Sequence, residues 1–179
     1  SSDLVATALA QVARSRGLRV IGTASTADKQ AFAIENGVTD LVDGDVKTLP
    51  QQVMELTGGR GVDLAFDHVG ADLFIACLRS LAPSGMAVSY NILAGPPSAD
   101  MFDELRKLLA RSLAIRTFSI HAVDADITQR RGLMEEAIRL MASGSVRAPR
   151  AMRMQLAQAR QAHELLDSGG TLGKLVLIP

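Results

Sequence analysis

Side chains with hydroxyl and amine groups follow a short apolar segment near the start of the chain. Leu18–Thr23 (LRVIGT) has the pattern of a buried strand, and Thr23, Ser25 and Lys29 stand at its end and just beyond it. In nucleotide-binding βαβ units, an acidic residue about 20 positions after a glycine-rich loop binds the ribose 2′-OH of NAD. Because hydroxyl groups stand there instead, this strand end lacks the acidic NAD signature.

A second group of candidates follows two further apolar segments, Val62–Asp67 (VDLAFD) and Met86–Tyr90. In open α/β sheets, ligands bind at the carboxyl ends of the strands, which makes these loops natural ligand contacts. The candidates are His68, Val69, Gly70, Tyr90, Asn91 and Ile92. The alternative is that they form ordinary connecting turns. His68 is titratable, but the sequence shows no partner for it.

Cysteine and histidine give no metal signal. Cys77 is the only cysteine and lies on an apolar helical stripe, so we expect a core residue, and a disulfide within the chain is excluded. His68, His121 and His163 are too far apart in sequence to suggest a metal site. We therefore expect no metal.

Composition narrows the class of protein. The chain has 179 residues, of which 47% are hydrophobic, and 19 basic residues balance 19 acidic ones. Without a basic patch interleaved with aromatic residues, nucleic-acid binding is not expected. No apolar run is long enough to span a membrane and no leader pattern opens the chain, which favours a cytoplasmic protein.

The apolar periodicity alternates between that of helices and that of strands, which predicts a Rossmann-like, doubly wound parallel sheet of the α/β class. We expect a turn at Pro83–Gly85 and Thr26 as a helix N-cap. The expected helices are 4–16, 27–36, 49–56, 71–81 and 101–111, and the expected strands are 18–23, 40–42, 62–67, 86–90 and 113–120. Residues 1–145 would form this domain. Residues 146–179, with an amphipathic stretch at 156–168 and a strand at 174–178, would form a return segment.

Six segments in order along the chain resemble one family. They are RVIGTAS, ADKQAFAIENGVTDLVD, ELTGGRGVDLAFDHVG, LRSLAPSGMAVSY, ASGSVRAP and QAHELLDSGGTLGKLVLIP. Together they are similar to the cofactor-binding half and C-terminal tail of the medium-chain dehydrogenase/reductases, especially the zinc-independent quinone oxidoreductases related to zeta-crystallin. The resemblance implies that the tail would pack on an N-terminal GroES-like domain, which this sequence does not include. It also implies that the sheet is truncated before its first strand.

The resemblance departs from the family at the phosphate loop. The family's AGGVG segment falls on Ser2–Ala6, so that Asp3 and Leu4 replace glycines. A Cβ at Leu4 would keep the backbone away from a pyrophosphate, and Asp3 would compete with it at the helix N-terminus. The alternative is that Ser2 and Asp3 simply cap the first helix.

The resemblance favours NADP(H) over NAD(H). It makes Lys29 the lysine that meets the 2′-phosphate, whereas the alternative is a solvated lysine beside Asp28. It also implies that backbone groups after Asp67 and Tyr90 contact the cofactor's ribose and carboxamide. Asp43 departs from the family, because a carboxylate near a 2′-phosphate would repel it.

The expected function of the parent protein is hydride transfer from NADPH to a small-molecule acceptor, either a quinone or an α,β-unsaturated carbonyl compound. No residue stands out as a catalytic acid, and the isolated chain should be nearly inactive. Two alternatives remain: a Rossmann-like interaction module that has lost its cofactor, and an enoyl-thioester reductase domain. The edge-like segment Leu113–Ser119 predicts a homodimer.

Overall fold

The computed structural model describes residues 4–179 and divides into two compact units. The first unit runs up to Leu41 and takes in Arg131–Pro179, and the second is Val42–Arg130. Within the described residues, all strand pairs with a defined register are parallel. Parallel pairing between strands that alternate with helices agrees with the expected α/β class.

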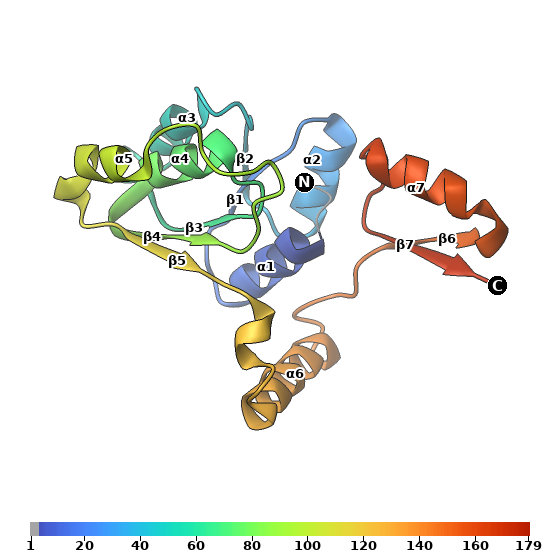
Figure 1. Cartoon of the computed structure of the whole chain (residues 1–179). Coiled ribbons are helices and arrows are strands. Elements are labelled where there is room, and N and C mark those ends of the chain that lie inside the picture. Colours follow the sequence, from blue (N-terminus) through green and yellow to red (C-terminus); the bar gives the residue numbers. More distant parts are fainter. Residues whose placement is uncertain (1–3) are drawn as a thin grey trace. The chain divides into compact units, whose positions relative to one another are not determined.

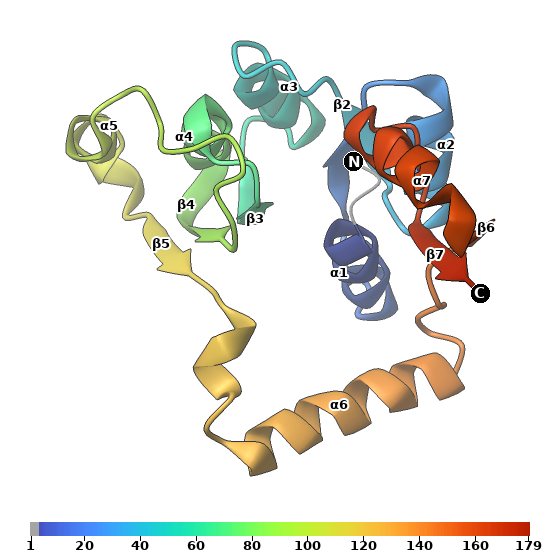
Figure 2. The ribbon, with the colours of Figure 1, turned by 45° about the vertical axis from the view of Figure 1, so that its right-hand side comes forward.

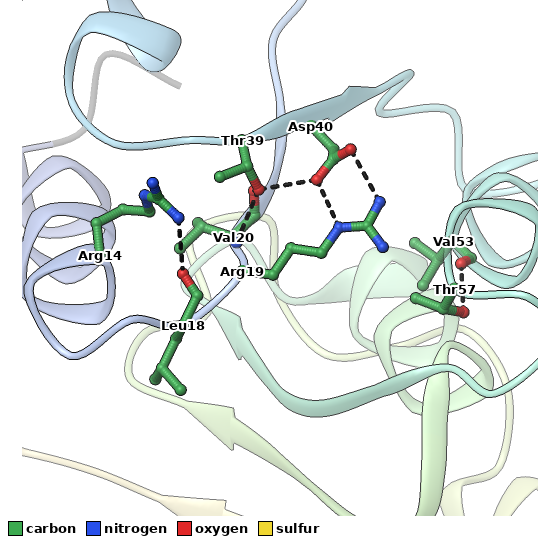
Figure 3. Close-up of polar contacts among 8 residues, drawn as sticks. All are labelled: Arg14, Leu18, Arg19, Val20, Thr39, Asp40, Val53 and Thr57. Carbon is green, nitrogen blue, oxygen red and sulfur yellow. Dashed lines mark hydrogen bonds and ion pairs between the residues drawn. The ribbon is translucent and has the colours of Figure 1, made fainter.

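The first unit begins with α1 (Leu4–Ser15), β1 (Ile21–Thr23) and α2 (Ala27–Glu35), and β1 pairs with β2 (Asp40–Val42). The guanidinium of Arg19 donates to both carboxylate oxygens of Asp40, at 2.7 and 2.9 Å (Figure 3). Thr26 caps α2 by accepting a hydrogen bond from the amide of Lys29 at 3.3 Å, which confirms the predicted N-cap.

The later part of the first unit contains most of α6 (Ile127–Ala142), then β6 (Ala151–Gln155), α7 (Ala159–Asp167) and β7 (Lys174–Ile178). Strands β6 and β7 pair in parallel, and α7 lies beside them (Figure 2). The buried side chain of Gln11 on α1 accepts from the amide of Arg147 at 2.6 Å. This bond ties the segment that enters β6 to the first helix.

The second unit contains α3 (Leu49–Leu56), β3 (Val62–Asp67), α4 (Ala71–Arg79), β4 (Leu81–Ser89), α5 (Met101–Lys107) and β5 (Ala114–Thr117). The strands run side by side in the order β3–β4–β5 (Figure 1). Its core brings apolar side chains of α4 against β4, namely Phe74, Ile75, Leu78, Leu81 and Ala87. Burying these side chains supplies the main stabilisation of this unit.

A buried carboxylate anchors α5 in the second unit. Glu104 is 3% exposed and pairs with Arg79 at 2.7 Å and Lys107 at 2.6 Å. Hydrogen bonds from Lys107 and Arg79 hold the pKa of Glu104 below its ordinary value. The carboxylate is therefore buried in its ionised form, and its negative charge is balanced by the two basic side chains.

Several predicted boundaries are confirmed and others are wrong. The elements at 40–42, 49–56, 62–67 and 174–178 have the predicted bounds. The first strand is shorter than Leu18–Thr23. The Val20 amide donates to the Thr39 hydroxyl instead of a backbone carbonyl, while the Val20 carbonyl accepts from the amides of Thr39 and Asp40. The strand β6 within 146–155 was not predicted.

The turn predicted at Pro83–Gly85 lies inside β4, which begins at Leu81 rather than Met86. The register with β3 jumps from Val62↔Leu81 to Leu64↔Met86, so the extra residues form a bulge instead of ending the strand. Ser84 has a φ of 61°, the left-handed conformation that such an irregularity requires. Helix α4 consequently ends at Arg79 and not at 81.

The elements predicted at 101–111 and 113–120 are also shorter. Helix α5 ends at Lys107 and is followed by a separate 3-10 turn at Leu109–Arg111. Ser112, with a φ of 53°, then reverses the chain into β5, which ends at Thr117. Within residues 4–179, no helix has both the length and the apolar character to cross a membrane.

Candidate cofactor site

The turn between β1 and α2 holds the first group of predicted site residues. Thr23 ends β1 and is partly buried, Ser25 is exposed, and Lys29 lies in the first turn of α2. Among the described residues the Lys29 ammonium forms no ion pair, including with its neighbour Asp28. Its charge is therefore available to an anion from outside the chain.

The C-terminal tail comes close to this lysine, which the sequence did not indicate. A Cβ added at Gly169, where φ is +65°, would lie 3.5 Å from Lys29 Nζ. Gly169 follows α7 and precedes β7, in the first unit like Lys29 itself. The glycine thus leaves the ammonium uncovered on that side.

The second group lies where β3 and β4 end, and its two loops are joined by backbone hydrogen bonds. Tyr90 N donates to Asp67 O at 3.0 Å, Leu93 N to His68 O at 3.2 Å, and Ala94 N to Val69 O at 2.7 Å. Ala71 N closes the series by donating to Gly95 O at 2.7 Å. We call residues 67–71 and 90–95 the paired loops.

Asp67 organises the first of the paired loops. Its carboxylate is 3% exposed and accepts hydrogen bonds from Val69 N at 3.1 Å and Gly70 N at 2.8 Å. Sequence reasoning placed Asp67 only at a strand end and missed this role. The available signal was an aspartate followed two and three residues later by backbone amides in a tight turn, a pattern that aspartate side chains favour.

Gly70 is needed for the contact between the paired loops. Its φ is +77°, and a Cβ there would lie 2.5 Å from Gly95 O. The open space at Gly70, which the sequence suggested for a ligand, is thus filled by the neighbouring loop. Its contact with a cofactor stays a prediction.

His68 has a partner in the structure, Tyr90. The Tyr90 hydroxyl lies 3.3 Å from His68 Nδ1, and the two rings stack with centroids 5.6 Å apart and an interplanar angle of 27°. Both side chains are partly buried. Asn91 and Ile92 follow on the outside: the Asn91 side chain accepts from Ile92 N at 2.8 Å, and Ile92 is 58% exposed.

Leu4–Ala6, which fall on the family's phosphate loop, lie in the first turn of α1. Ser2 and Asp3, predicted either to cap this helix or to compete with a phosphate, lie outside the described residues. Asp43 is exposed, and its carboxylate accepts from Asp45 N at 3.2 Å.

The structure also shows what surrounds the remaining nucleophilic and titratable candidates. Burial raises the pKa of the Cys77 thiol to about 12, with a smaller effect of the Asp67 charge, so the thiol is unreactive. His121 Nδ1 lies 2.7 Å from an Asp124 carboxylate oxygen on the surface. In residues 4–179, no three His, Cys, Asp or Glu side chains are grouped so that they could hold a metal ion.

The residues of the first group fit a phosphorylated ribose. Lys29 supplies an unpaired positive charge, and Thr23 and Ser25 supply hydroxyl donors. No carboxylate stands at the end of β1, where it would favour a free ribose 2′-OH and repel a phosphate. These are the kinds of donor that a 2′-phosphate would need.

Comparison with known proteins places the chain in a family. The family model described as zinc-binding dehydrogenase matches residues 5–143. The chain is 31% identical over 177 residues to a quinone oxidoreductase of Salmonella typhimurium, covering 94% of this chain and 52% of that protein. A 2-haloacrylate reductase of a Burkholderia species is 30% identical and is covered to 50%. The chain thus spans about half the length of the curated relatives it matches.

Solved structures agree with the sequence comparison. The mycobacterial protein Rv1454c, solved in complex with NADPH, superposes with a TM-score of 0.85 at 31% identity, over 97% of this chain and 53% of that one. The fold is accordingly Rossmann-like, as the periodicity predicted. With the family model covering most of its length, the chain belongs to the medium-chain dehydrogenase/reductases described as zinc-binding dehydrogenases, and within them to the zinc-independent quinone oxidoreductases.

Proposed function

We propose that the chain is the cofactor-binding portion of an NADPH-dependent oxidoreductase whose acceptor is a quinone or an α,β-unsaturated carbonyl compound. Bound NADPH would supply the hydride, and the protein's part is to bind and orient the reactants. The proposal is supported by the quinone oxidoreductase and 2-haloacrylate reductase relatives, and by a similar protein solved with NADPH.

The observation that carries the cofactor preference is the ammonium of Lys29, in the first turn of α2, which forms no ion pair among the described residues. A charge-assisted contact of this kind contributes about 1.5–3 kcal/mol, or roughly 10- to 100-fold in affinity. The contact exists only when the ribose carries a phosphate. Lys29 would therefore bind NADPH and contribute little to NADH.

The paired loops would supply the second contact region, on the nicotinamide side. They stand at the carboxyl ends of β3 and β4, where open α/β sheets bind ligands. Their backbone is held by Asp67 and by the hydrogen bonds between the loops before any ligand arrives. A site organised in advance loses less conformational freedom on binding.

The test is a calorimetric titration of the full-length protein with NADPH and with NADH. We expect Lys29→Ala to weaken NADPH binding roughly 10- to 100-fold and to change NADH binding little. Lys47→Ala, which removes an exposed lysine elsewhere, is the matched control and should change neither. Equal losses for both nucleotides in Lys29→Ala would contradict the assigned role of this lysine.

Two further outcomes would identify another function. No binding of NADPH at millimolar concentration would favour an interaction module that has lost its cofactor. Binding of NADPH with reduction of acyl thioesters but not of quinones would identify an enoyl-thioester reductase. Comparing NADPH oxidation by the full-length protein and by this chain alone tests whether the chain is inactive by itself.

A further inference from the structure

Helix α2 and the C-terminal tail (residues 146–179) lie side by side in the first unit (Figures 1 and 2). They meet at Lys29 and Gly169, where a Cβ built on the glycine would lie 3.5 Å from Lys29 Nζ. Both residues are partly buried. The ammonium and the tail are therefore neighbours, although the two residues are far apart in the sequence.

The tail has a fixed backbone at this point. Gly169 N donates to Leu166 O at 3.0 Å, and the next amide donates to Leu165 O at 3.0 Å. Gly169 has a φ of +65°, the left-handed conformation in which a glycine commonly ends a helix. The position next to Lys29 is thus a hydrogen-bonded turn that directly follows α7.

The end of α7 offers the ammonium a favourable electrostatic environment. The last carbonyls of a helix carry a partial negative charge, which basic side chains near that end usually balance. The last turn of α7 contains no basic side chain, and Asp167 ends the helix. Lys29, on another helix, places its ammonium against this end. The tail therefore helps to hold the ammonium, and Gly169 adds no side chain that would cover it.

The boundary between α2 and the tail also contains open space. A cavity of about 330 Å³ is lined there by Asp28, Ala31, Phe32, Glu35, Arg150 and Leu172. The first of these residues precedes Lys29 in the sequence, and the last follows the turn at Gly169. The boundary is therefore not a tightly packed interface, and it has room for a group of a bound molecule.

We propose that Gly169 is a specificity-determining residue for the cofactor. The tail forms one wall of the site for the 2′-phosphate, and the missing side chain at Gly169 leaves room for this phosphate on Lys29. The inference rests on the proposed function, in which Lys29 meets the 2′-phosphate. A charge-assisted hydrogen bond of an ammonium is about 2.7–2.9 Å long. A side chain of several heavy atoms at position 169 would compete with the phosphate for the space beside Nζ.

Calorimetric titration of the full-length protein with NADPH and with NADH tests this proposal. In Gly169→Asp, the new carboxylate comes within reach of Lys29 Nζ and repels a phosphate. We expect the affinity for NADPH to fall at least tenfold, which corresponds to the loss of one charge-assisted contact, and the affinity for NADH to change little.

Two control variants separate charge from size and from backbone conformation. Gly169→Asn has the shape of aspartate and its tolerance for the left-handed conformation, but it has no charge. It should show a smaller loss of NADPH affinity, which comes from its size alone. Gly144→Asp adds the same carboxylate at another glycine of positive φ, +74°, where a Cβ would meet nothing within 4 Å. It should change the binding of neither nucleotide.

A double-mutant cycle tests whether position 169 acts on the lysine. In the Lys29→Ala background there is no ammonium for the new carboxylate to neutralise. Gly169→Asp should therefore weaken NADPH binding by a smaller factor there than in the wild type. Additive losses would mean that the two positions act independently and would overturn the proposal.

The outcomes distinguish this inference from the proposed function. Absence of NADPH binding by the wild-type protein overturns both. The expected loss in Lys29→Ala together with unchanged NADPH affinity in Gly169→Asp overturns only the inference and leaves Gly169 as the residue that ends α7. Equal losses for NADPH and NADH in Gly169→Asp and Gly169→Asn also overturn it, because the tail would then affect binding without reading the 2′-phosphate.

Discussion

At the scale of single residues, Gly70 is the position where the paired loops tolerate no side chain. Replacing it with alanine forces a Cβ to within 2.5 Å of Gly95 O at a φ of +77°. With a φ of +77° and a ψ of −144°, Gly70 has a backbone conformation that glycine alone adopts readily, and a residue with a side chain pays roughly 1–3 kcal/mol for it. We expect Gly70→Ala to lower the free energy of unfolding by more than that, measured by urea denaturation.

Gly58 offers a matched control for this experiment. It also has a positive φ, +62°, but a Cβ there would meet nothing within 4 Å. Gly58→Ala should therefore show the conformational cost alone, about 1–2 kcal/mol. Equal losses for the two variants would mean that the contact between the loops contributes nothing.

Asp40 should make the stability of the first unit depend on pH. Hydrogen bonds from Arg19 and then Thr39 lower the pKa of Asp40 from 3.8 to about 2 (Figure 3). A carboxylate whose pKa is depressed by folding stabilises the protein above its unfolded pKa, and this contribution is lost as pH falls toward the folded value. The stability difference between wild type and Asp40→Asn should thus shrink between about pH 4 and pH 2.

Urea midpoints measured across that pH range check this prediction. The effect should be small and weaker in high salt, because the Arg19 side chain is half exposed. Asp28→Asn removes a carboxylate that forms no ion pair among the described residues and should show no such convergence. A constant difference between wild type and Asp40→Asn from pH 7 to 2 would contradict the linkage.

Residue-scale prediction from the sequence succeeded where one side chain acts on its own backbone. Thr26 as an N-cap depends on a local hydrogen bond, and local patterns reveal it. The partner of His68 comes from 22 positions away, and the contact of Gly70 with Gly95 depends on how two loops meet. Such contacts follow from strand pairing, which a single sequence does not specify.

At the scale of elements, β5 has a free edge. It pairs with β4 on one side, and no described strand pairs with its other side. Ile115 and Phe118 at this edge are 38% and 48% exposed. Unpaired backbone groups flanked by apolar side chains favour addition of another strand, and we expect a homodimer formed through this edge.

Analytical ultracentrifugation of the full-length protein checks the dimer. Thr117→Lys places a charge on β5, a substitution that discourages edge pairing, and should raise the dimer dissociation constant at least tenfold. Thr128→Lys adds the same charge to the exposed surface of α6 and should not. A wild-type monomer at micromolar concentration would contradict the prediction.

Element boundaries were predictable where periodicity and punctuation agree, as in VDLAFD before His68. The predicted boundaries were wrong where residues that usually end a strand do not end it here. Pro83–Gly85 reads as a turn, but the parallel ladder with β3 resumes after it, so that the residues bulge within one strand. Strand β6 was not predicted, because its residues, AMRMQ, are largely exposed and form a strand by pairing with β7.

At the scale of the whole molecule, the class of fold was the most predictable property. Helix-like and strand-like apolar periods alternate over more than 100 residues, so an error in one element boundary does not change the predicted class of fold. The prediction agrees with the family model, which matches residues 5–143. The division of the tail at residue 146 stays a prediction. The identity of the acceptor could not be predicted, because an acceptor is selected by pocket walls that this chain's sequence does not specify.

The paired loops have a practical consequence for protein engineering. Their four backbone hydrogen bonds and the Gly70–Gly95 contact make residues 67–71 and 90–95 complementary in length and conformation. Transplanting one of them alone from a related protein would leave mismatched donors and acceptors at the strand ends. The two segments should be exchanged together, as one cassette, even though 18 residues of helix and strand separate them in the sequence.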